Sequence, residues 1–134
     1  MRLSLQNIEQ PMKLHHSNQD GLNIIKAYSE HSVSVNEDTF TRSIVVQAHL
    51  LNPEWPPQNV EELDNAAIRE LAKLDTEIIL LGTGQKQCFP DRRLFVPLYD
   101  RNIGIEVMDT PAACRTYNIL LEEGRAVTAA LLVN

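Results

Sequence analysis

Cysteine is scarce in this sequence, and its two copies do not form a recognisable pair. Cys88 and Cys114 are the only cysteines among 134 residues. They make neither the disulfide framework of a small secreted domain nor a Cys-x-x-Cys site, so we expect reduced thiols. The histidines lack the spacing to Cys, Asp or Glu that metal sites use, which predicts no metal site. They are His15, His16, His31 and His49.

An excess of positive charge and a long apolar run are also missing. Lys and Arg number 12 against 18 Asp and Glu, which gives a formal net charge of −6. This balance argues against nucleic acid or an anionic membrane as the main partner. No apolar run reaches membrane-spanning length, and the first residues resemble neither a signal peptide nor a transit peptide. We therefore expect a soluble, cytoplasmic protein that does not span a membrane.

Length and composition indicate one globular domain over residues 1–134, because 43% of the residues are apolar and 22% charged. Residues 1–21 are mixed and polar, with a weak edge-strand pattern at Met12–His16. Residues 22–50 predict an antiparallel β meander. Its expected strands are Leu22–Ser29, Ser32–Val35 and Phe40–His49. Prolines at positions 53, 56 and 57 then interrupt regular structure.

Residues 60–134 alternate between helical and strand patterns. Apolar residues at helical spacing predict a helix over Val60–Leu74, and a short buried strand is expected over Glu77–Leu81. A second helix is expected over Asp91–Arg101, where Pro97 must kink it or leave it partly irregular. A strand at 104–108 follows. Strands joined by helical crossovers favour a parallel sheet with right-handed connections, and therefore an α/β fold.

The last helix has expected ends on both sides. Thr110 fits the N-cap, and Pro111 fits the first helical position, where its missing N–H costs nothing. Gly124 supplies the left-handed residue that commonly ends a helix. The apolar run Ala126–Val133 then predicts a strand buried on both faces.

A Gly-x-Gly turn follows the strand that ends near Leu81. Its residues are Gly82, Thr83 and Gly84. Glycines in such a turn can let backbone N–H groups approach a phosphate near a helix N-terminus. However, the third glycine of a dinucleotide fingerprint is replaced by Gln87, and no Gly-Lys-Ser/Thr follows. A tight turn at the carboxyl edge of the sheet is the favoured interpretation.

Cys114 lies in the first turns of the last helix, beside Arg115. A thiol in that position can have a lowered pKa and become nucleophilic. Cys114 also shares the apolar stripe of Tyr117 and Leu121, which favours a buried packing role. A histidine close in space, such as His49, would change that balance.

Three further polar residues accompany this helix. Asp109 ends the preceding strand, while Arg115 and Asn118 lie three residues apart on another face of the helix. One hypothesis places them in a ligand site at the carboxyl edge, where open α/β sheets bind ligands. The other is that Asp109 binds free helix N–H groups while Arg115 and Asn118 tie neighbouring loops. Both remain open from the sequence.

Three stretches together resemble one protein family. They are LLGTG at 80–84, Phe89-Pro90 and GIEVMDTPAACRTYNILLEEGRAVTAALL at 104–132. The resemblance is to the family of mitochondrial respiratory complex I assembly factor 3 and its bacterial branch. It implies a three-layer α/β fold, called Mth938-like, with a central mixed sheet and a β-rich N-terminal side. The family's marked positions fall on Gly82, Gly84, Asp109, Thr110, Pro111, Ala112, Cys114, Arg115, Asn118 and Gly124.

The resemblance also implies a function. The eukaryotic members are protein-binding factors in the assembly of NADH:ubiquinone oxidoreductase, and the family has no established catalytic residues. Our leading hypothesis is a non-enzymatic binding or assembly factor without a cofactor, whose partners are proteins of a membrane respiratory complex. The alternative is a small-molecule or nucleotide-binding protein, or an enzyme, that uses the carboxyl edge of the parallel strands. Its candidate residues are Gly82, Thr83, Gly84, Asp109, Thr110, Arg115 and Asn118.

Overall fold

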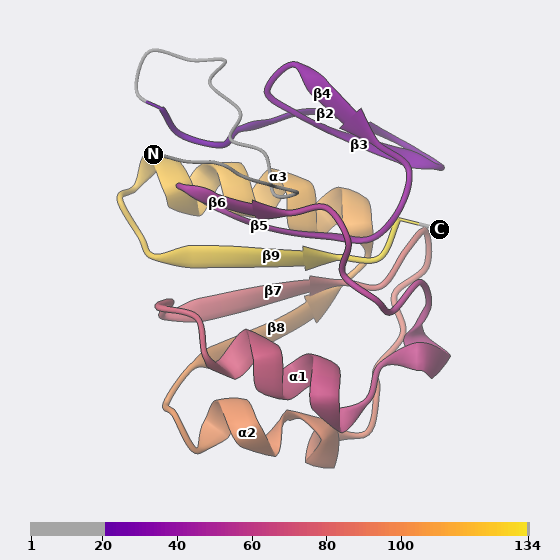
Figure 1. Ribbon diagram of the computed structural model, residues 1–134, viewed down its shortest axis with the longest axis vertical. Coiled ribbons are helices and arrows are strands. Elements are labelled where there is room, and N and C mark those ends of the chain that lie inside the picture. The colour runs from indigo at the N-terminus through magenta and orange to yellow at the C-terminus, as the bar shows by residue number, and fades with distance from the viewer. Residues whose placement is uncertain (1–20, 134) are drawn as a thin grey trace, which may run out of the picture.

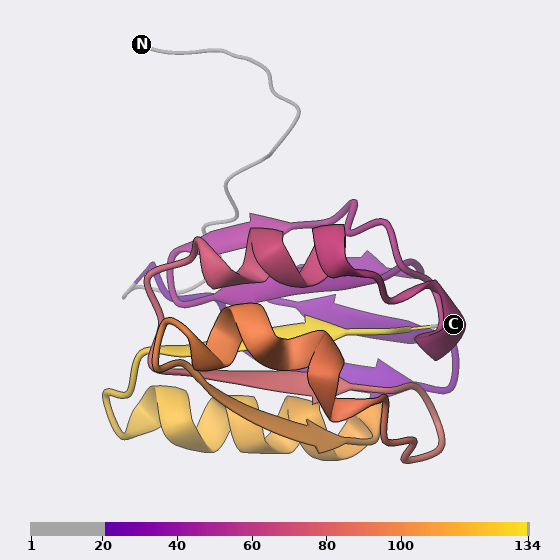
Figure 2. The same ribbon diagram turned by 90° about the horizontal axis from the view of Figure 1, so that it is seen from below.

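A computed structural model describes residues 21–133 and arranges them in three layers. A five-stranded sheet forms the middle layer (Figure 1). Helix α3 and a small three-stranded sheet cover one face, and helices α1 and α2 cover the other. Figure 2 shows α1 and α2 side by side in front of the central sheet. This confirms the three-layer α/β class. The expected strand Met12–His16 lies outside the described residues.

The small sheet is an antiparallel meander in which only the first two strands match the expected ones. Its strands are β2 (Ile25–Ser29), β3 (Ser32–Val35) and β4 (Asp38–Phe40), with β3 in the middle. Asn36 has a left-handed φ of 54° in the β3–β4 turn, which suits asparagine.

The prediction of one strand over Phe40–His49 was wrong. The chain leaves the small sheet after β4 and enters the central sheet as β5 (Ile44–Gln47), paired with β6 (Leu50–Asn52). The change of direction is fixed at Ser43, whose N–H donates to Gln58 Oε1 (3.1 Å) instead of a neighbouring strand. Periodicity alone could not locate this exchange between sheets, because Phe40 and the apolar run at 44–46 are close enough in the sequence to fit one strand.

The central sheet is mixed, with the order β6-β5-β9-β7-β8. Strand β7 (Ile78–Gly82) pairs in parallel with both β8 (Gly104–Met108) and β9 (Val127–Leu131). Strand β5 pairs antiparallel with β9 and β6. The parallel pairs confirm the expected crossovers, and all five residues of β9 are buried, as expected for a strand covered on both faces.

Alternate side chains of the central strands point to opposite faces of the sheet and pack into two separate cores. On the α3 side, Ala129 and Leu131 of β9 pack with Tyr117 and with Val35 from the small sheet. On the α1 side, Ala130 and Leu132 belong to a second cluster with Trp55, Ile68 and Phe95. The period of two along β9 thus divides one strand between both cores.

The first two predicted helices are shorter than expected. The expected helix Val60–Leu74 splits into a 3₁₀ turn η1 (Val60–Glu62) and α1 (Asn65–Ala72). Asp64 separates them with an extended backbone, and its carboxylate accepts a hydrogen bond from Ala67 N (2.8 Å) as an N-cap. The expected helix Asp91–Arg101 becomes a 3₁₀ turn η2 (Arg92–Phe95) followed by α2 (Val96–Tyr99). As expected, the segment around Pro97 is not one regular helix.

Helix α3 (Thr110–Glu122) closes the fold. Its N-cap is Asp109, whose carboxylate accepts from Ala112 N (2.8 Å), so the prediction of Thr110 as the cap was wrong by one residue. Gly124 follows with φ of 78°, the left-handed conformation expected there. None of the helices formed by residues 21–133 is long and apolar enough to span a membrane.

Candidate functional site

The predicted site lies at the carboxyl edge of β7 and β8, where three distant segments are joined by backbone hydrogen bonds. Thr83 N donates to Met108 O (2.9 Å), and Thr110 N donates to Gly84 O (2.8 Å). Leu132 N donates to Gly82 O (2.9 Å). The Gly-x-Gly turn, the start of α3 and the end of β9 therefore form one rigid junction, which we call the edge junction (residues 82–84, 108–110 and 132).

The Thr110 hydroxyl lies at the centre of the edge junction. It donates to Leu132 O (2.6 Å) and accepts from Gly84 N (2.8 Å), and the residue is only 3% exposed. One hydroxyl thus satisfies a buried carbonyl and a buried amide, each of which would be costly to leave unpaired. Its partners are 22 and 26 residues away in the chain.

The two glycines of the turn are required by this close approach. A Cβ at Gly82 would lie 2.8 Å from Thr110 Oγ1 and 2.9 Å from Thr110 Cα. Gly84 has φ of 98°, a conformation that side chains strongly disfavour. Both glycines are therefore explained by packing and backbone geometry, without a ligand.

The backbone amides that a phosphate would need at this edge are already bound. Gly84 N is held by Thr110, Thr110 N by Gly84 O, and Ala112 N by Asp109 Oδ1. Ala113 N donates to Asp109 O (3.0 Å), and Pro111 has no N–H. The first turn of α3 therefore offers no open anion cradle.

Thr83 is also occupied within the chain. Its hydroxyl donates to Lys86 O (2.7 Å) and accepts from Cys88 N (3.2 Å), which holds the following loop in place. Groups of three or more His, Cys, Asp or Glu side chains able to hold a metal ion do not occur in residues 21–133.

Cys114 is a packing residue in this arrangement. It is 1% exposed and belongs to the core on the α3 side. Burial raises the pKa of its thiol to about 12, and the neighbouring Arg115 only partly offsets this. His49 does not assist it. His49 shares a hollow with Ala126 and Val127 at the amino-terminal end of β9, opposite to the edge junction.

Arg115 and Asn118 lie away from the edge junction and face β2. The Asn118 amide makes two hydrogen bonds to the backbone of Ile25, accepting from its N (3.1 Å) and donating to its O (2.7 Å). Arg115 Nη1 donates to the Tyr28 hydroxyl (2.8 Å) at the exposed surface. Asn118 is two helical turns beyond Thr110, about 12 Å along the axis. The candidate residues are thus divided between two places.

A buried asparagine pair, absent from our predicted residues, joins the two sheets. Asn36 Nδ2 donates to Asn23 Oδ1 (3.1 Å), and Asn23 Nδ2 donates to Gln47 O (3.0 Å) in β5. The Tyr117 hydroxyl donates a hydrogen bond to Asn23 O (2.8 Å), and burial raises the pKa of this phenol. Asparagine at a turn was the only sequence signal for this network.

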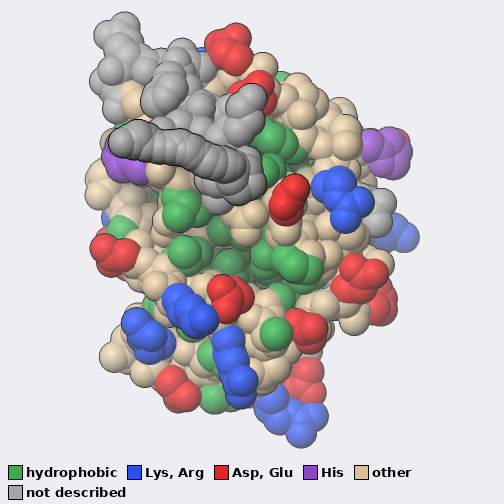
Figure 3. Space-filling view, viewed as in Figure 1, with side chains coloured by type: hydrophobic (Ala, Val, Ile, Leu, Met, Phe, Trp, Pro, Cys, Tyr) green, Lys and Arg blue, Asp and Glu red, His purple; other side chains and the backbone are tan. Residues whose placement is uncertain are grey.

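A small hollow of about 170 Å³ lies between β6 and α1. Val45, Leu50, Leu71 and Leu74 supply its apolar lining, and hydrophobic side chains are visible between the central sheet and α1 in Figure 3. Trp55 also lines it, and the indole Nε1 of this residue is buried without a hydrogen-bond partner in the described structure.

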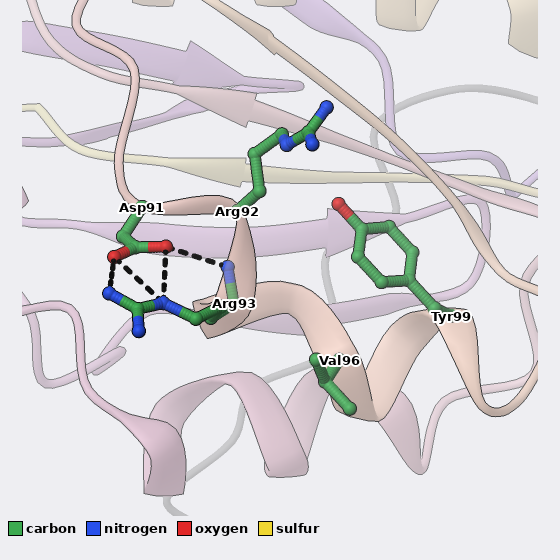
Figure 4. A pocket seen from close by; sticks show the side chains of 5 residues that line it. All are labelled: Asp91, Arg92, Arg93, Val96 and Tyr99. Carbon is green, nitrogen blue, oxygen red and sulfur yellow. Dashed lines mark hydrogen bonds and ion pairs between the residues drawn. The ribbon is translucent and has the colours of Figure 1, made fainter.

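A larger, open hollow of about 520 Å³ lies over η2 and α2, a segment that carried no recognisable motif. Asp91, Arg92, Arg93, Val96 and Tyr99 line it (Figure 4). Arg93 donates to both carboxylate oxygens of Asp91, at 3.1 Å from Nε and 2.6 Å from Nη2. These hydrogen bonds lower the pKa of Asp91 to about 2. Arg92 extends away from this pair, and the Tyr99 hydroxyl points back toward the Arg92 side chain (Figure 4).

A family model described as a protein of unknown function (DUF498/DUF598) matches residues 25–132. The match covers nearly all of the described fold, so the chain belongs to this family.

Relatives of known structure share the fold. A crystal structure of a Bordetella parapertussis protein superimposes with a TM-score of 0.79 and 35% identity, covering 84% of this chain and 97% of that one. A Bordetella pertussis protein, described as a Mth938-like domain, has a TM-score of 0.71 and 32% identity. Coverage is 91% of this chain and 92% of that domain. The Mth938-like fold expected from the resemblance is confirmed.

A curated relative carries a functional name. NADH dehydrogenase (ubiquinone) 1 alpha subcomplex assembly factor 3 of Danio rerio is 29% identical over 110 residues, which are 81% of this chain. The match spans 63% of the relative's own length. The family resemblance seen in the sequence is thereby confirmed.

Proposed function

We propose that this member of the DUF498 family is a non-catalytic protein-binding factor that assists the assembly of a membrane-bound respiratory complex. The observation that carries the proposal is its similarity over 81% of the chain to an assembly factor named for NADH dehydrogenase. The partners would be subunits of that complex, met on its cytoplasmic side. This location follows the sequence-based expectation of a cytoplasmic protein.

The chemistry of the edge junction supports a binding role over a catalytic one. Thr110 and Asp109 are engaged in hydrogen bonds within the chain, and the thiol of Cys114 is kept protonated by burial. A general base, a nucleophile or an oxyanion donor needs an accessible group with an available lone pair or proton. The polar groups of the junction instead form hydrogen bonds that hold β7, β9 and α3 together.

Removal of the gene from the source organism tests this proposal. The membranes of the deletion strain should lose NADH:ubiquinone oxidoreductase activity and the assembled complex, and the wild-type chain should restore both. Succinate:quinone activity is the matched control and should not change. Normal activity and normal assembly in the deletion strain would contradict the proposal.

A nucleotide-binding role for the same edge predicts a different result. Any ligand that binds only the native state must raise the thermal midpoint. Purified chain should therefore show no shift with millimolar nucleotides, because the amides of Gly84, Thr110 and Ala112 are already bound. A nucleotide that raises the midpoint in proportion to its concentration would revive that role.

A further inference from the structure

The segment formed by η2 and α2 carries apolar side chains on two opposite sides. Phe95 and Leu98 lie three residues apart and are 3% and 0% exposed, which anchors the segment in the core on the α1 side. Val96 and Tyr99 have the same spacing but are 44% and 46% exposed. A surface helix normally places polar residues on its outer side. Folding of the described structure therefore gives no reason for Val96 and Tyr99 to be apolar.

Exposed apolar residues are concentrated on this segment. Five large hydrophobic side chains of the described structure are exposed, and three of them lie between residues 89 and 99. The most exposed is Phe89, at 74%, in the loop before η2. Val96 and Tyr99 line one hollow together with Arg92, and exposed apolar side chains beside charged ones are typical of protein-binding surfaces, where Tyr, Phe and Arg are enriched.

The charge of this segment is opposite to that of the whole chain. Residues 86–101 contain four Lys or Arg and two Asp, a net charge of +2, whereas the whole chain carries −6. Asp91 is already paired with Arg93. The guanidinium of Arg92 lines the hollow and has no hydrogen-bond or ion-pair partner within residues 21–133, and Figure 4 shows it extended away from the Asp91–Arg93 pair. An unpaired guanidinium is suited to bind a carboxylate through two hydrogen bonds.

The backbone that presents these side chains is already fixed. The Asp91 carboxylate accepts from Arg93 N (2.9 Å) as the cap of η2, and prolines at positions 90 and 97 restrict the chain on either side. A surface held in its binding conformation loses little entropy when a partner docks.

We propose that Arg92, Val96 and Tyr99 form a docking surface for an acidic segment of a partner protein. An aliphatic or aromatic side chain of that segment fills the hollow between Val96 and Tyr99, and a neighbouring carboxylate binds Arg92. This surface, which we call the α2 surface, rests on the proposed function, because it supplies the contact that a protein-binding factor requires.

Fluorescence polarisation with labelled peptides tests the α2 surface directly. The probes are peptides in which Asp or Glu alternates with Leu or Phe, and matched peptides that carry Asn or Gln in place of the acids. The full chain should bind the acidic peptides more tightly, and added salt should weaken that binding. Arg92→Glu should reduce the affinity at least about tenfold, because a charge of the wrong sign then faces the carboxylate.

Two further variants and one control complete the experiment. Tyr99→Ser and Val96→Ser should each weaken binding about tenfold, as central contact residues do. Arg42→Glu makes the same change of charge at an exposed position between β4 and β5, and should alter affinity less than about twofold. Absence of binding by the acidic peptides, or equal binding by wild type and Arg92→Glu, would overturn the proposal.

Other occupants give distinct results. Dimerisation of the wild type in sedimentation velocity that Tyr99→Ser abolishes would identify a second copy of this chain and overturn the proposal. Binding to phosphatidylglycerol vesicles that Arg92→Glu abolishes, with no binding of the acidic peptides, would identify a membrane and also overturn it.

The deletion strain separates this inference from the proposed function. If the wild-type chain restores the respiratory complex and Arg92→Glu does not, the α2 surface is supported. If both restore it equally, the α2 surface is wrong although the function holds. If loss of the gene leaves the complex unchanged, the proposed function fails, and the peptide measurements alone judge the surface.

Discussion

The two helical crossovers of the central sheet differ in what their side chains contact. The crossover from β8 to β9 contains α3 and begins at the edge junction, where the Thr110 hydroxyl and the capping carboxylate of Asp109 bind backbone groups of the chain itself. The crossover from β7 to β8 contains η2 and α2 and leaves Val96 and Tyr99 exposed. The candidate residues at the start of the α3 crossover are therefore explained by packing, whereas residues 91–99 of the other crossover, which carried no candidate residue, offer an outer surface.

Each crossover contains one cysteine, and the rates of thiol labelling should separate them most strongly. Cys88 is exposed, whereas Cys114 is buried and its pKa is raised to about 12. Labelling of the folded chain by a thiol reagent at neutral pH should modify Cys88 at least about a hundredfold faster, because Cys114 reacts only when the structure opens. Cys88→Ser should leave one slow thiol that becomes fast in denaturant. Rapid labelling of that variant in the native state would show that the α3 crossover is open.

Adding one methyl group at the edge junction should destabilise the chain severely. The Cβ of Gly82→Ala would approach Thr110 Cα to 2.9 Å, and backbone at that distance cannot move aside cheaply. We expect a loss of about 3 kcal/mol in the free energy of unfolding, measured with urea. Gly104→Ala is the control in the same sheet, because the nearest atom to its Cβ is 3.5 Å away. Equal denaturation midpoints for the two variants would show that the junction is not tightly packed.

Removal of the Thr110 hydroxyl tests the same junction without adding volume. Thr110→Val leaves Gly84 N and Leu132 O without their buried partner, which should cost about 2 kcal/mol. Thr110→Ser keeps the hydroxyl and should lose much less in the same urea measurement. If Val and Ser substitutions were equally tolerated, water would have to reach both backbone groups, and the junction would be open enough to reconsider a ligand.

Local pattern was sufficient to predict the parallel part of the fold. Strands β7, β8 and β9 are short apolar runs, and the segments between them have the periodicity of helices. Gly124 occupies the left-handed position after α3, as expected. The errors occurred where two local signals compete. Asp64 interrupts an amphipathic pattern by capping α1, and Asp109 precedes Thr110 with an equally good capping side chain. Periodicity does not rank such alternatives.

The candidate sites were harder to predict because they depend on contacts between distant residues. The partners of Thr110 are 22 and 26 residues away, and those of Asn118 are 93 residues away, so their roles appear only in three dimensions. The α2 surface was not predicted from the sequence, for a different reason. Phe95, Val96, Leu98 and Tyr99 are all apolar or aromatic, and spacing alone cannot say which of them face the core.

The smallest effect on stability should come from the other crossover. Tyr99 is 46% exposed, so Tyr99→Ser removes only part of a buried side chain and should lower the free energy of unfolding by about 1 kcal/mol. Urea unfolding measures this, with Leu98→Ser as the neighbouring buried control, which should lose several kcal/mol because Leu98 is fully buried in the core. If Tyr99→Ser were as damaging as a change at the edge junction, Tyr99 would be a structural residue. The apolar outer side of α2 would then need no partner to explain it, and the contrast between the two crossovers would disappear.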